Sequence, residues 1–277
     1  MEVVLDNGQQ ITIYSDDTWQ TSSNGPIRQQ RALMGDCFDA QKNWEFSSPS
    51  FQPRGWAAVQ TQPRDSVKLI AQVGPTIQKI AELPVVDSWK LTNGDWVFDF
   101  GQNLVGVVRL KIKGKPGQTI TVRHAEMLHG LDDRSIYITN LRSAKATDTF
   151  ILAGQGVETL EPSFTLHGFL YIQVSGLTPQ KPAKDLFTAL VYHSNTPVTG
   201  RFACSHAKLN QLQHNIVWGQ KGNFVEVPTD CPQRDERLGW MGDAQVFIRT
   251  ATFNIDVAGF FNRWLLDVAD AQLLDGA

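Results

Sequence analysis

Alternating apolar and polar residues dominate the chain up to about residue 196 and predict β-strands. Near the N-terminus, apolar runs on both sides of Asn7-Gly8 predict a β-hairpin, because Asn-Gly favours the tight turn that joins two strands. Further strand patterns follow at short intervals over residues 76–196, as where Ile120 and Val122 alternate with polar neighbours. No helical pattern separates these strands, so an antiparallel β-sandwich is expected there.

Beyond residue 200 the apolar residues recur at helical spacing. Leu209 and Leu212 lie on one face of a predicted helix, for which Ser205 is a suitable N-cap. Two more helices are predicted from Asp243 and from Asp256 onward. The chain therefore changes from strands to packed helices.

This change of pattern and the composition divide the chain into three predicted domains. Residues 1–75 are expected to form a partial N-terminal β-sandwich, residues 76–198 a second β-sandwich, and residues 199–277 the start of a helical domain. Pro197 and Gly200 mark the last boundary. The predicted fold class is mixed and multidomain, with antiparallel β-sandwich domains followed by helices.

Three tryptophans, Trp19, Trp44 and Trp56, lie among Gly, Pro and Ser in the N-terminal region. They could form a platform on which sugar rings stack. Aromatic residues in such a region are more often anchors of a small β-domain core, and we favour this second interpretation.

Composition restricts the possible functions. The chain has 277 residues, a net charge of −3 and 42% hydrophobic residues, which is ordinary globular composition. Because the charge is near neutral and basic clusters are absent from the sequence, no nucleic-acid or membrane partner is expected. No apolar run approaches the ~20 residues of a membrane span.

The start of the chain and its cysteines bear on the compartment. The opening MEVVLDNGQQ has neither the basic start nor the apolar core of a signal peptide. Cys37, Cys204 and Cys231 form no CxxC pair and no disulfide framework, which slightly favours the cytoplasm. The localisation is otherwise open.

The stretch Val227–Gln245, VPTDCPQRDERLGWMGDAQ, has an unusual composition. Its prolines and glycines keep most of it out of regular helix, and helix-like segments flank it. A charged irregular loop between packed helices is a common mount for catalytic groups. The charged and aromatic side chains of this signature loop are Asp230, Arg234, Asp235, Glu236, Arg237, Trp240 and Asp243.

Two simpler interpretations compete with a catalytic one. A run of mixed charge is most often a solvated surface, but such a surface needs no Trp or Cys, and Arg in place of Lys suits bidentate hydrogen bonding. Clustered carboxylates also bind calcium, but the alternating pattern of a calcium loop is absent from the sequence, and two arginines interrupt the cluster. No metal is therefore expected. Cys231 has no base beside it in the sequence and is expected to be structural.

The histidines give no sign of a metal site in the sequence. His124 and His167 lie in strand-like segments, and His206 and His214 lie on the first predicted helix. None has a second histidine at metal-ligand spacing, so we expect each to be a structural histidine with its hydrogen bonds satisfied.

The string DCPQRDERLGWMGD, residues 230–243, closely resembles the signature of the bacterial α-L-rhamnosidase family. Members of that family are inverting glycoside hydrolases with β-sandwich domains and an (α/α)6 barrel. Only Met241 departs from the family form, which has Thr there. The phrases DFGQN, HAE and HGFLYI also resemble the family's second β-sandwich, with Leu170 replacing the usual Arg.

The resemblance implies a role for each matching residue. Glu236 corresponds to the general acid, Asp230, Arg234 and Asp243 to residues that hydrogen-bond sugar hydroxyls, and Trp240 to an aromatic wall of the pocket. These residue types suit the chemistry, because protonating a glycosidic oxygen requires a carboxylic acid in a dry site.

The two remaining charged residues of the signature loop, Asp235 and Arg237, are expected to be structural. Because they are adjacent to the acid in sequence, they could orient it or tie the loop to its surroundings.

The helical region is too short for a complete barrel. Twelve helices need about 200 residues, and residues 199–277 suffice for about three. The family's general base lies in barrel sequence that this chain does not contain. We therefore expect a fragment or a shortened relative, inactive alone, whose apolar face around Phe260 and Trp264 pairs with the remaining barrel segment or with another copy.

The leading functional hypothesis is an enzyme, an α-L-rhamnosidase that needs no cofactor. It would remove terminal α-L-rhamnose with inversion from a rhamnosylated small molecule or polysaccharide. The alternative is a non-catalytic carbohydrate-binding β-sandwich protein with a vestigial helical tail. A related (α/α)6 hydrolase acting on another sugar is a third possibility.

Overall fold

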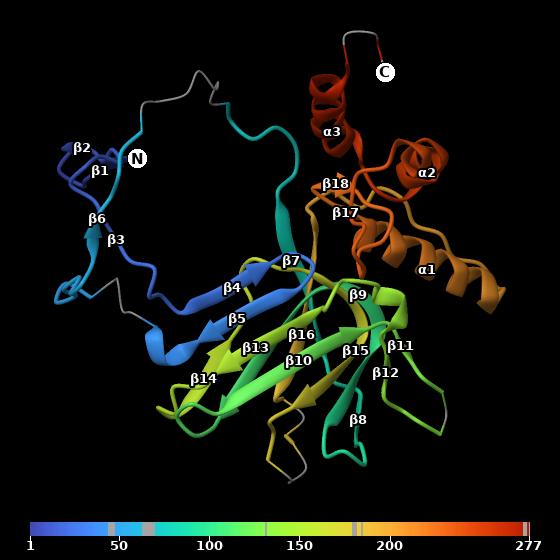
Figure 1. Ribbon diagram of the computed structural model, residues 1–277. Helices are drawn as coiled ribbons and strands as arrows, with labels where there is room; N and C mark the ends of the chain where they lie inside the picture. Colours follow the sequence, from blue (N-terminus) through green and yellow to red (C-terminus); the bar gives the residue numbers. More distant parts are fainter. Residues whose placement is uncertain are drawn as a thin grey trace. The chain divides into compact units, whose positions relative to one another are not determined.

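The computed structural model describes residues 1–43, 48–62, 70–130, 132–178, 182–183, 185–273 and 276. They form two compact units. The smaller unit comprises Met1–Pro26 and Lys42–Ala71, and the larger comprises Ile27–Gln41 and Gln72–Ala277. Figure 1 shows the elements of both units along the chain.

The smaller unit contains two short sheets. The predicted hairpin is confirmed, because β1 (Glu2–Val4) pairs antiparallel with β2 (Gln10–Thr12). A second pair joins β3 (Gln20–Thr21) to β6 (Ala57–Ala58). The partial N-terminal sandwich over residues 1–75 stays a prediction.

The tryptophans of this region do not all behave as core anchors. Trp19 is 49% exposed, so the expectation that it anchors a core is wrong for this residue. Its indole N–H donates to the carbonyl of Tyr14 at 2.9 Å, which satisfies the ring nitrogen at the surface. Trp56 packs edge-on against Phe51 at 5.8 Å between ring centroids, and Trp44 lies outside the described residues.

The larger unit is built around a ten-stranded sheet with the order β4-β5-β13-β10-β15-β9-β16-β7. Strands β8 and β14 also pair with β9. The strands are β4 (Ile27–Arg31), β5 (Gly35–Asp39), β7 (Ile77–Pro84), β8 (Asp87–Lys90), β9 (Trp96–Lys113), β10 (Thr119–Ala125), β13 (Thr147–Ile151), β14 (Val157–Leu160), β15 (His167–Ser175) and β16 (Phe187–Ser194).

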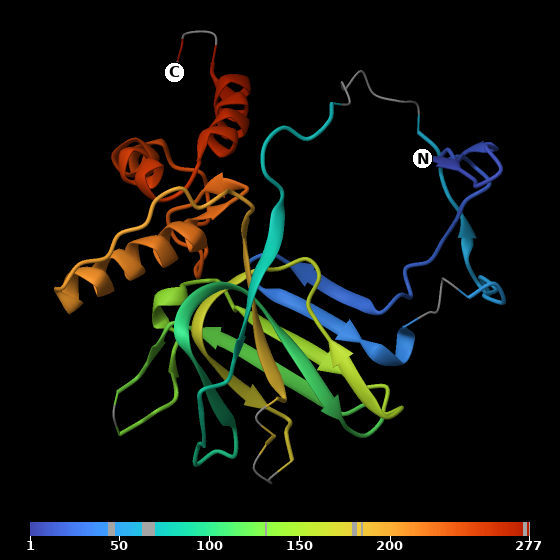
Figure 2. The ribbon, with the colours of Figure 1, turned by 180° about the vertical axis from the view of Figure 1, so that it is seen from behind.

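Strand β9 lets the sheet curl around one core. Its first residues pair with β8 and β15, and its last residues pair with β16 and β14. The sheet bends along this strand, as the two opposite views show (Figure 1, Figure 2). Large side chains such as Phe98, Phe150, Phe169 and Phe187 are almost fully buried inside the curl. Each such burial contributes roughly 1.5–3 kcal/mol to folding.

The expectation of a purely antiparallel arrangement is wrong at one pair of strands. β5 runs parallel to β13, with Cys37 opposite Thr149 and Phe38 opposite Phe150. Parallel pairing needs a long connection, and these strands are separated by most of the sheet in sequence. No local pattern therefore indicates that residues 27–39 join this sheet.

Three helices follow the sheet, as predicted: α1 (Ala207–Asn223), α2 (Met241–Asn254) and α3 (Ala258–Ala271). The predicted N-cap is wrong, because His206 and not Ser205 precedes α1, and no side-chain hydrogen bond caps that end. Between α1 and α2 lies a small hairpin of β17 (Phe224–Val225) and β18 (Val227–Pro228). Another short pair joins β11 (Met127–Leu128) to β12 (Ile136–Tyr137).

The apolar face around Phe260 and Trp264 is not exposed, which corrects the expectation that it lacks partners. These side chains are 1% and 6% exposed. The ring of Phe260 stacks on Phe224 with centroids 4.5 Å apart, so the hairpin between α1 and α2 covers α3.

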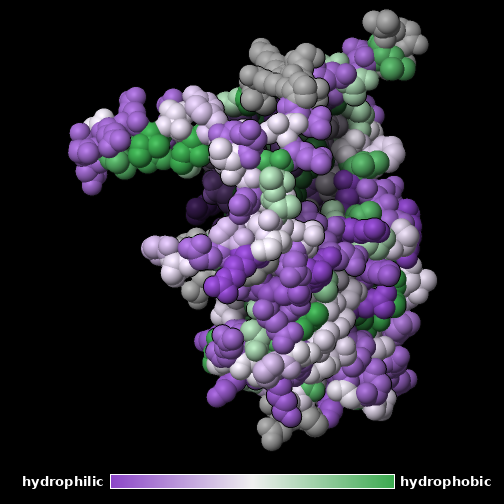
Figure 3. Space-filling view, turned by 60° about the vertical axis from the view of Figure 1, so that its left-hand side comes forward, coloured by the Kyte–Doolittle hydropathy of each residue, from purple (hydrophilic) through white to green (hydrophobic). Residues whose placement is uncertain are grey.

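Other apolar side chains of the helices do reach the surface. The most exposed on α2 and α3 are Val246 (78%), Phe253 (66%), Leu265 (49%) and Leu266 (47%). On the face drawn in Figure 3, hydrophilic residues predominate and hydrophobic ones reach the surface in small groups. None of the helices in the described ranges is long and apolar enough to span a membrane.

Candidate active site

Residues 229–240 of the signature loop connect β18 to α2, and the two ends of this connection pair with each other. Thr229 and Gly239 form an isolated antiparallel bridge, and the Trp240 N–H donates to the Pro228 carbonyl at 3.3 Å. Within the loop, Arg237 has a φ of 47°, a left-handed conformation that interrupts any regular element. The loop therefore presents its charged side chains from a closed, irregular frame.

Three of the predicted site residues come together in this loop. Atom Nη2 of Arg234 lies 3.1 Å from Oε2 of Glu236. Ligand atoms of Asp230, Cys231 and Glu236 all lie within 4.8 Å of one another. Such a group of donor atoms could hold a cation, so the expectation of no metal stays a prediction. The Arg234 guanidinium on Glu236 opposes it, because a cation there would meet like charge.

Cys231 shows no sign of an activated thiol. Burial, and next the hydrogen bond and negative charge of Asp230, raise the pKa of the Cys231 thiol above its ordinary value. A thiol with a raised pKa is a poor nucleophile at neutral pH. The structure is therefore consistent with a structural role for this residue.

Asp230 and Asp243 line a pocket of about 500 Å³ between α1 and α2. Asp243 lies in the first turn of α2, and the polar side chains of Gln220 and Asn223 line the pocket from α1. Trp240 precedes α2, is 43% exposed and is not among the residues that line this pocket. Its assignment as an aromatic wall stays a prediction.

Further contacts of the acidic loop residues come from a segment that sequence analysis missed. Ser143, from the turn before β13, donates its backbone N–H (3.1 Å) and its hydroxyl to Oδ2 of Asp235. Its neighbour Arg142 places Nη2 3.2 Å from Oε2 of Glu236 and Nη1 3.6 Å from Oδ1 of Asp235. The surrounding sequence, TNLRSAKATD, has no motif that could have indicated this.

Arg237 anchors the signature loop to the residues before β5 and before β15. Tying the loop to its surroundings is one of the two roles expected for this residue. Its Nη1 donates to the carbonyls of Ala32, at 2.8 Å, and Leu166. Burial without a carboxylate partner lowers the pKa of Arg237 to about 10. The guanidinium is thus a buried anchor and has no described contact with Glu236.

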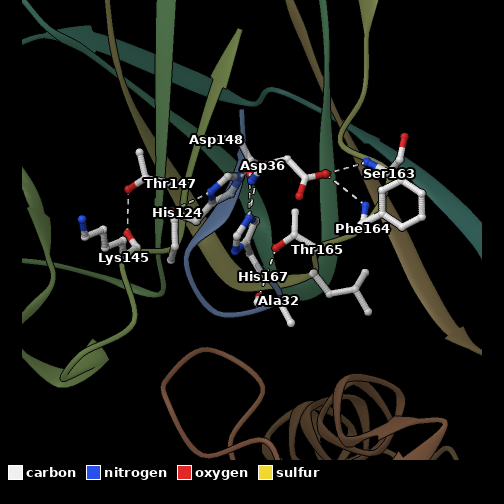
Figure 4. Close-up of polar contacts among 12 residues, drawn as sticks. Ala32, Asp36, His124, Lys145, Thr147, Asp148, Ser163, Phe164, Thr165 and His167 are labelled. Atoms are coloured by element: carbon white, nitrogen blue, oxygen red, sulfur yellow. Dashed lines mark hydrogen bonds and ion pairs between the residues drawn. The ribbon is translucent and has the colours of Figure 1, made fainter. Parts of the chain in front are cut away.

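The two segments that receive Arg237 are fixed by a buried polar network (Figure 4). The Thr165 hydroxyl donates to the Ala32 carbonyl at 3.0 Å. Oδ2 of Asp36 accepts the backbone N–H groups of Ser163 and Phe164, at 2.9 and 3.0 Å. These bonds hold the turn before β5 beside the segment before β15, so the signature loop docks onto a rigid surface.

The network extends to a buried pair of stacked histidines, whose rings lie 4.1 Å apart at 21° (Figure 4). Nε2 of His167 lies 3.2 Å from both carboxylate oxygens of Asp148, and Nδ1 of His124 lies 3.0 Å from the Ala146 carbonyl. Burial, and next the proximity of His167, lower the pKa of His124 to about 3.

The expectation that the hydrogen bonds of these two histidines are satisfied is wrong, because Nε2 of His124 and Nδ1 of His167 have no hydrogen-bond partner among the described residues. Their structural role stays a prediction. Their nitrogens and the Asp148 carboxylate lie close enough to suggest a metal site. An imidazole binds a metal in its own ring plane, and two nearly parallel stacked rings cannot both point at one ion. The geometry therefore favours a hydrogen-bonded cluster.

Three family models match consecutive segments of the chain. Residues 1–81 match the alpha-L-rhamnosidase N-terminal domain, residues 89–193 the bacterial alpha-L-rhamnosidase concanavalin-like domain, and residues 197–277 the bacterial alpha-L-rhamnosidase 6 hairpin glycosidase domain. Together they account for almost the whole chain.

Solved and curated relatives agree with these matches. The Streptomyces avermitilis alpha-L-rhamnosidase complexed with L-rhamnose has a TM-score of 0.94 and 45% identity, over 100% of this chain and 27% of that one. The alpha-L-rhamnosidase from Dictyoglumus thermophilum has a TM-score of 0.93 and 36% identity, over 100% and 31%. An alpha-L-rhamnosidase of Formosa agariphila is 42% identical, over 100% of this chain and 30% of its own length.

The chain thus spans less than a third of the length of these relatives. Its strands and its three helices correspond to consecutive domains of one kind of protein, in one order. The chain belongs to the bacterial α-L-rhamnosidase family.

Proposed function

We propose that the protein carrying this chain hydrolyses terminal α-L-rhamnosyl residues, with Glu236 as the general acid. The observation that carries this proposal is the cluster of Asp230, Arg234 and Glu236 in the signature loop. The names of the relatives support it, as does the L-rhamnose complex of the Streptomyces avermitilis protein.

Different residues would serve sugar binding and proton transfer. Glu236 would donate its proton to the glycosidic oxygen as the bond to the sugar breaks, while Arg234 holds the carboxyl group in place. Asp230 and Asp243 would accept hydrogen bonds from sugar hydroxyls in the pocket they line. A sugar that lacks those hydroxyls would leave two carboxylates unpaired and would bind poorly.

Inversion requires a second carboxylate with a water between it and the acid. The separation in inverting enzymes is about 6.5–9.5 Å. Asp230 does not fit that role, because its carboxylate lies within 4.8 Å of Glu236. We therefore place the general base in the remaining barrel segment, with α1, α2 and α3 as the first helices of an (α/α)6 barrel.

The short separation favours a second candidate mechanism. Retaining glycosidases hold their two carboxyl groups about 5–5.5 Å apart, and one of them attacks the sugar directly. Asp230 could be that nucleophile. The two mechanisms differ in the first product, because inversion of an α-L-rhamnoside releases β-L-rhamnose and retention releases α-L-rhamnose.

The test is turnover of a phenyl α-L-rhamnoside by the full-length protein, with the product anomer followed by proton NMR. We expect β-L-rhamnose first and a loss on the order of 10²–10⁴-fold in Glu236→Gln. Glu226→Gln is the matched control, since Glu226 precedes the loop, pairs with Arg263 on α3 at 4.0 Å and should leave turnover unchanged.

Each other outcome contradicts a specific part of the proposal. Initial release of α-L-rhamnose would replace inversion by retention. Undiminished turnover in Glu236→Gln would exclude this residue as the acid. Binding of L-rhamnose without any turnover would favour the non-catalytic carbohydrate-binding alternative.

A further inference from the structure

Arg142 lies in a segment that is fixed on both sides of it. Leu141 and Ala144 are 1% and 2% exposed, and they pack in a small apolar cluster at the end of the sheet. Between them, Arg142 adopts φ 55° and ψ −118°, a conformation that is costly for any residue except glycine. A residue held in such a conformation has its side-chain direction set by the buried residues around it.

The side chain of Arg142 reaches the acid and its neighbour at once. Nη2 lies 3.2 Å from Oε2 of Glu236, and Nη1 lies 3.6 Å from Oδ1 of Asp235. Asp235 is itself held by the two hydrogen bonds from Ser143. The planar guanidinium therefore links Glu236 to a carboxylate that Ser143 already holds.

Glu236 has two guanidiniums on the same oxygen atom, from different parts of the fold. Arg234 approaches from the signature loop at 3.1 Å, and Arg142 approaches at 3.2 Å from the turn before β13. Neither contact has the directed geometry of a hydrogen bond, since Oε2 has no hydrogen-bond partner among the described residues. Arg234 would move with the loop, whereas Arg142 links the Glu236 carboxyl group directly to the turn before β13.

We infer that Arg142 is a positioning residue for Glu236, through which the turn before β13 sets the direction of the acid toward the glycosidic oxygen. This inference rests on the proposed function, because it assigns Arg142 a role only through the general acid. A displacement of about 1 Å in a catalytic group can cost on the order of 10²-fold in rate. Arg142 itself touches no substrate atom in this scheme.

The test uses two substrates whose leaving groups differ. A 2,4-dinitrophenolate leaves without being protonated, whereas a phenolate needs the acid. In the full-length protein, Arg142→Gln should lower kcat on phenyl α-L-rhamnoside by about 10- to 100-fold, with KM within about twofold. It should leave turnover of 2,4-dinitrophenyl α-L-rhamnoside nearly unchanged. Glu236→Gln should also lose turnover on the phenyl rhamnoside and much less on the dinitrophenyl rhamnoside. Arg142→Lys should recover part of the turnover that Arg142→Gln loses on the phenyl rhamnoside.

Arg134→Gln is the matched control, from another connecting segment of the larger unit. The Arg134 side chain is 46% exposed, against 52% for Arg142, and its ion pair with Asp87 is 3.5 Å long. This variant should act on both substrates as the wild type does. A thermal midpoint of Arg142→Gln within a few degrees of the wild type would exclude misfolding as the cause of its loss.

The outcomes separate the two proposals. Equal losses of turnover in Arg142→Gln on both substrates, or no loss on either, would overturn the role of Arg142. The proposed function would still stand if the wild type were active and Glu236→Gln impaired. A wild type that is inert on both rhamnosides, or a Glu236→Gln variant as active as the wild type, would overturn the proposed function and this inference together.

Discussion

Ser143 donates two hydrogen bonds to one carboxylate oxygen of Asp235, one from its backbone N–H and one from its hydroxyl. The two residues are 92 positions apart in sequence and lie in different connecting segments of the larger unit. The bonds lower the pKa of Asp235 below its ordinary value, with the side-chain hydroxyl as the largest cause. The pair joins the signature loop to the turn before β13, next to the proposed acid.

Ser143→Ala should raise the pKa of Asp235 toward its ordinary value, because the hydroxyl is lost and the backbone N–H remains. In the wild type the folded pKa is the lower one, so the stabilisation by Asp235 is present above its ordinary pKa and is lost as the pH falls through the folded value. NMR titration of the carboxyl carbon would measure this shift. Asp133, whose pKa is lowered in the same way by Ser135, should not move and is an internal control.

Arg237→Met should loosen the signature loop, since it removes the donors to the Ala32 and Leu166 carbonyls and leaves both without this partner. We expect amide hydrogen exchange over residues 229–240 to become faster by an amount equivalent to about 1–3 kcal/mol. Arg263→Gln is the control, because it removes an exposed ion pair with Asp267 and should cost no more than about 0.5 kcal/mol. Unchanged exchange in Arg237→Met would show that the anchor is dispensable.

Gly168→Ala should displace the signature loop from β15. A Cβ atom at Gly168 would lie 2.9 Å from the Cβ of Gln233 and 3.1 Å from its backbone nitrogen, so the loop must move. We expect a loss of about 1–3 kcal/mol in stability and a lower kcat on phenyl α-L-rhamnoside.

Gly219 provides the matched glycine, because a Cβ there would meet no atom within 4 Å. It lies inside α1, where alanine is favoured over glycine, so Gly219→Ala should raise stability by about 0.5–1 kcal/mol. Thermal unfolding of both variants measures the difference. If Gly168→Ala is as stable and as active as the wild type, the close packing of β15 against Gln233 is not required.

The stability of the larger unit should fall as the pH drops below about 6.5. Burial lowers the pKa of His124 to about 3 and that of His193 to about 4. Between those values and about 6.5 the unfolded chain binds protons that the folded chain does not, so stability rises with pH. The slope should be on the order of 1 kcal/mol per pH unit for each histidine.

Denaturant unfolding at several pH values would measure that slope. His193→Asn should reduce it, and substitution of the exposed His206 by Asn should not. A slope that is the same in His193→Asn and in the wild type would mean that His193 titrates normally in the folded protein.

Much of the fold follows from local patterns. The Asn7-Gly8 hairpin, the strands around β9 and β10, and the three helices were predictable, since alternation and helical spacing reflect which side chains must be buried. The N-cap of α1 and the parallel pairing of β5 with β13 were not. The identity of the cap changes when the helix start moves by one residue, and a parallel pair forms between segments that are far apart along the chain.

For the candidate site, the sequence by itself determined the family and the set of charged side chains in the signature loop. That string is unusual enough in composition and order to identify its relatives without any coordinates. It also indicated that Arg237 could act as an anchor, because its neighbour in the string was the proposed acid.

Only the tertiary structure decided what surrounds Glu236. Arg142 and Ser143 come from a turn before β13 that has no sequence motif, and Asp230 comes close to Glu236 because the loop closes at Thr229 and Gly239. Similarly, Phe224 covers Phe260, which the helical pattern alone left exposed. The physical reason is the same in each case: hydrophobic periodicity describes burial along one element, whereas charge pairs and packed rings depend on which distant elements meet.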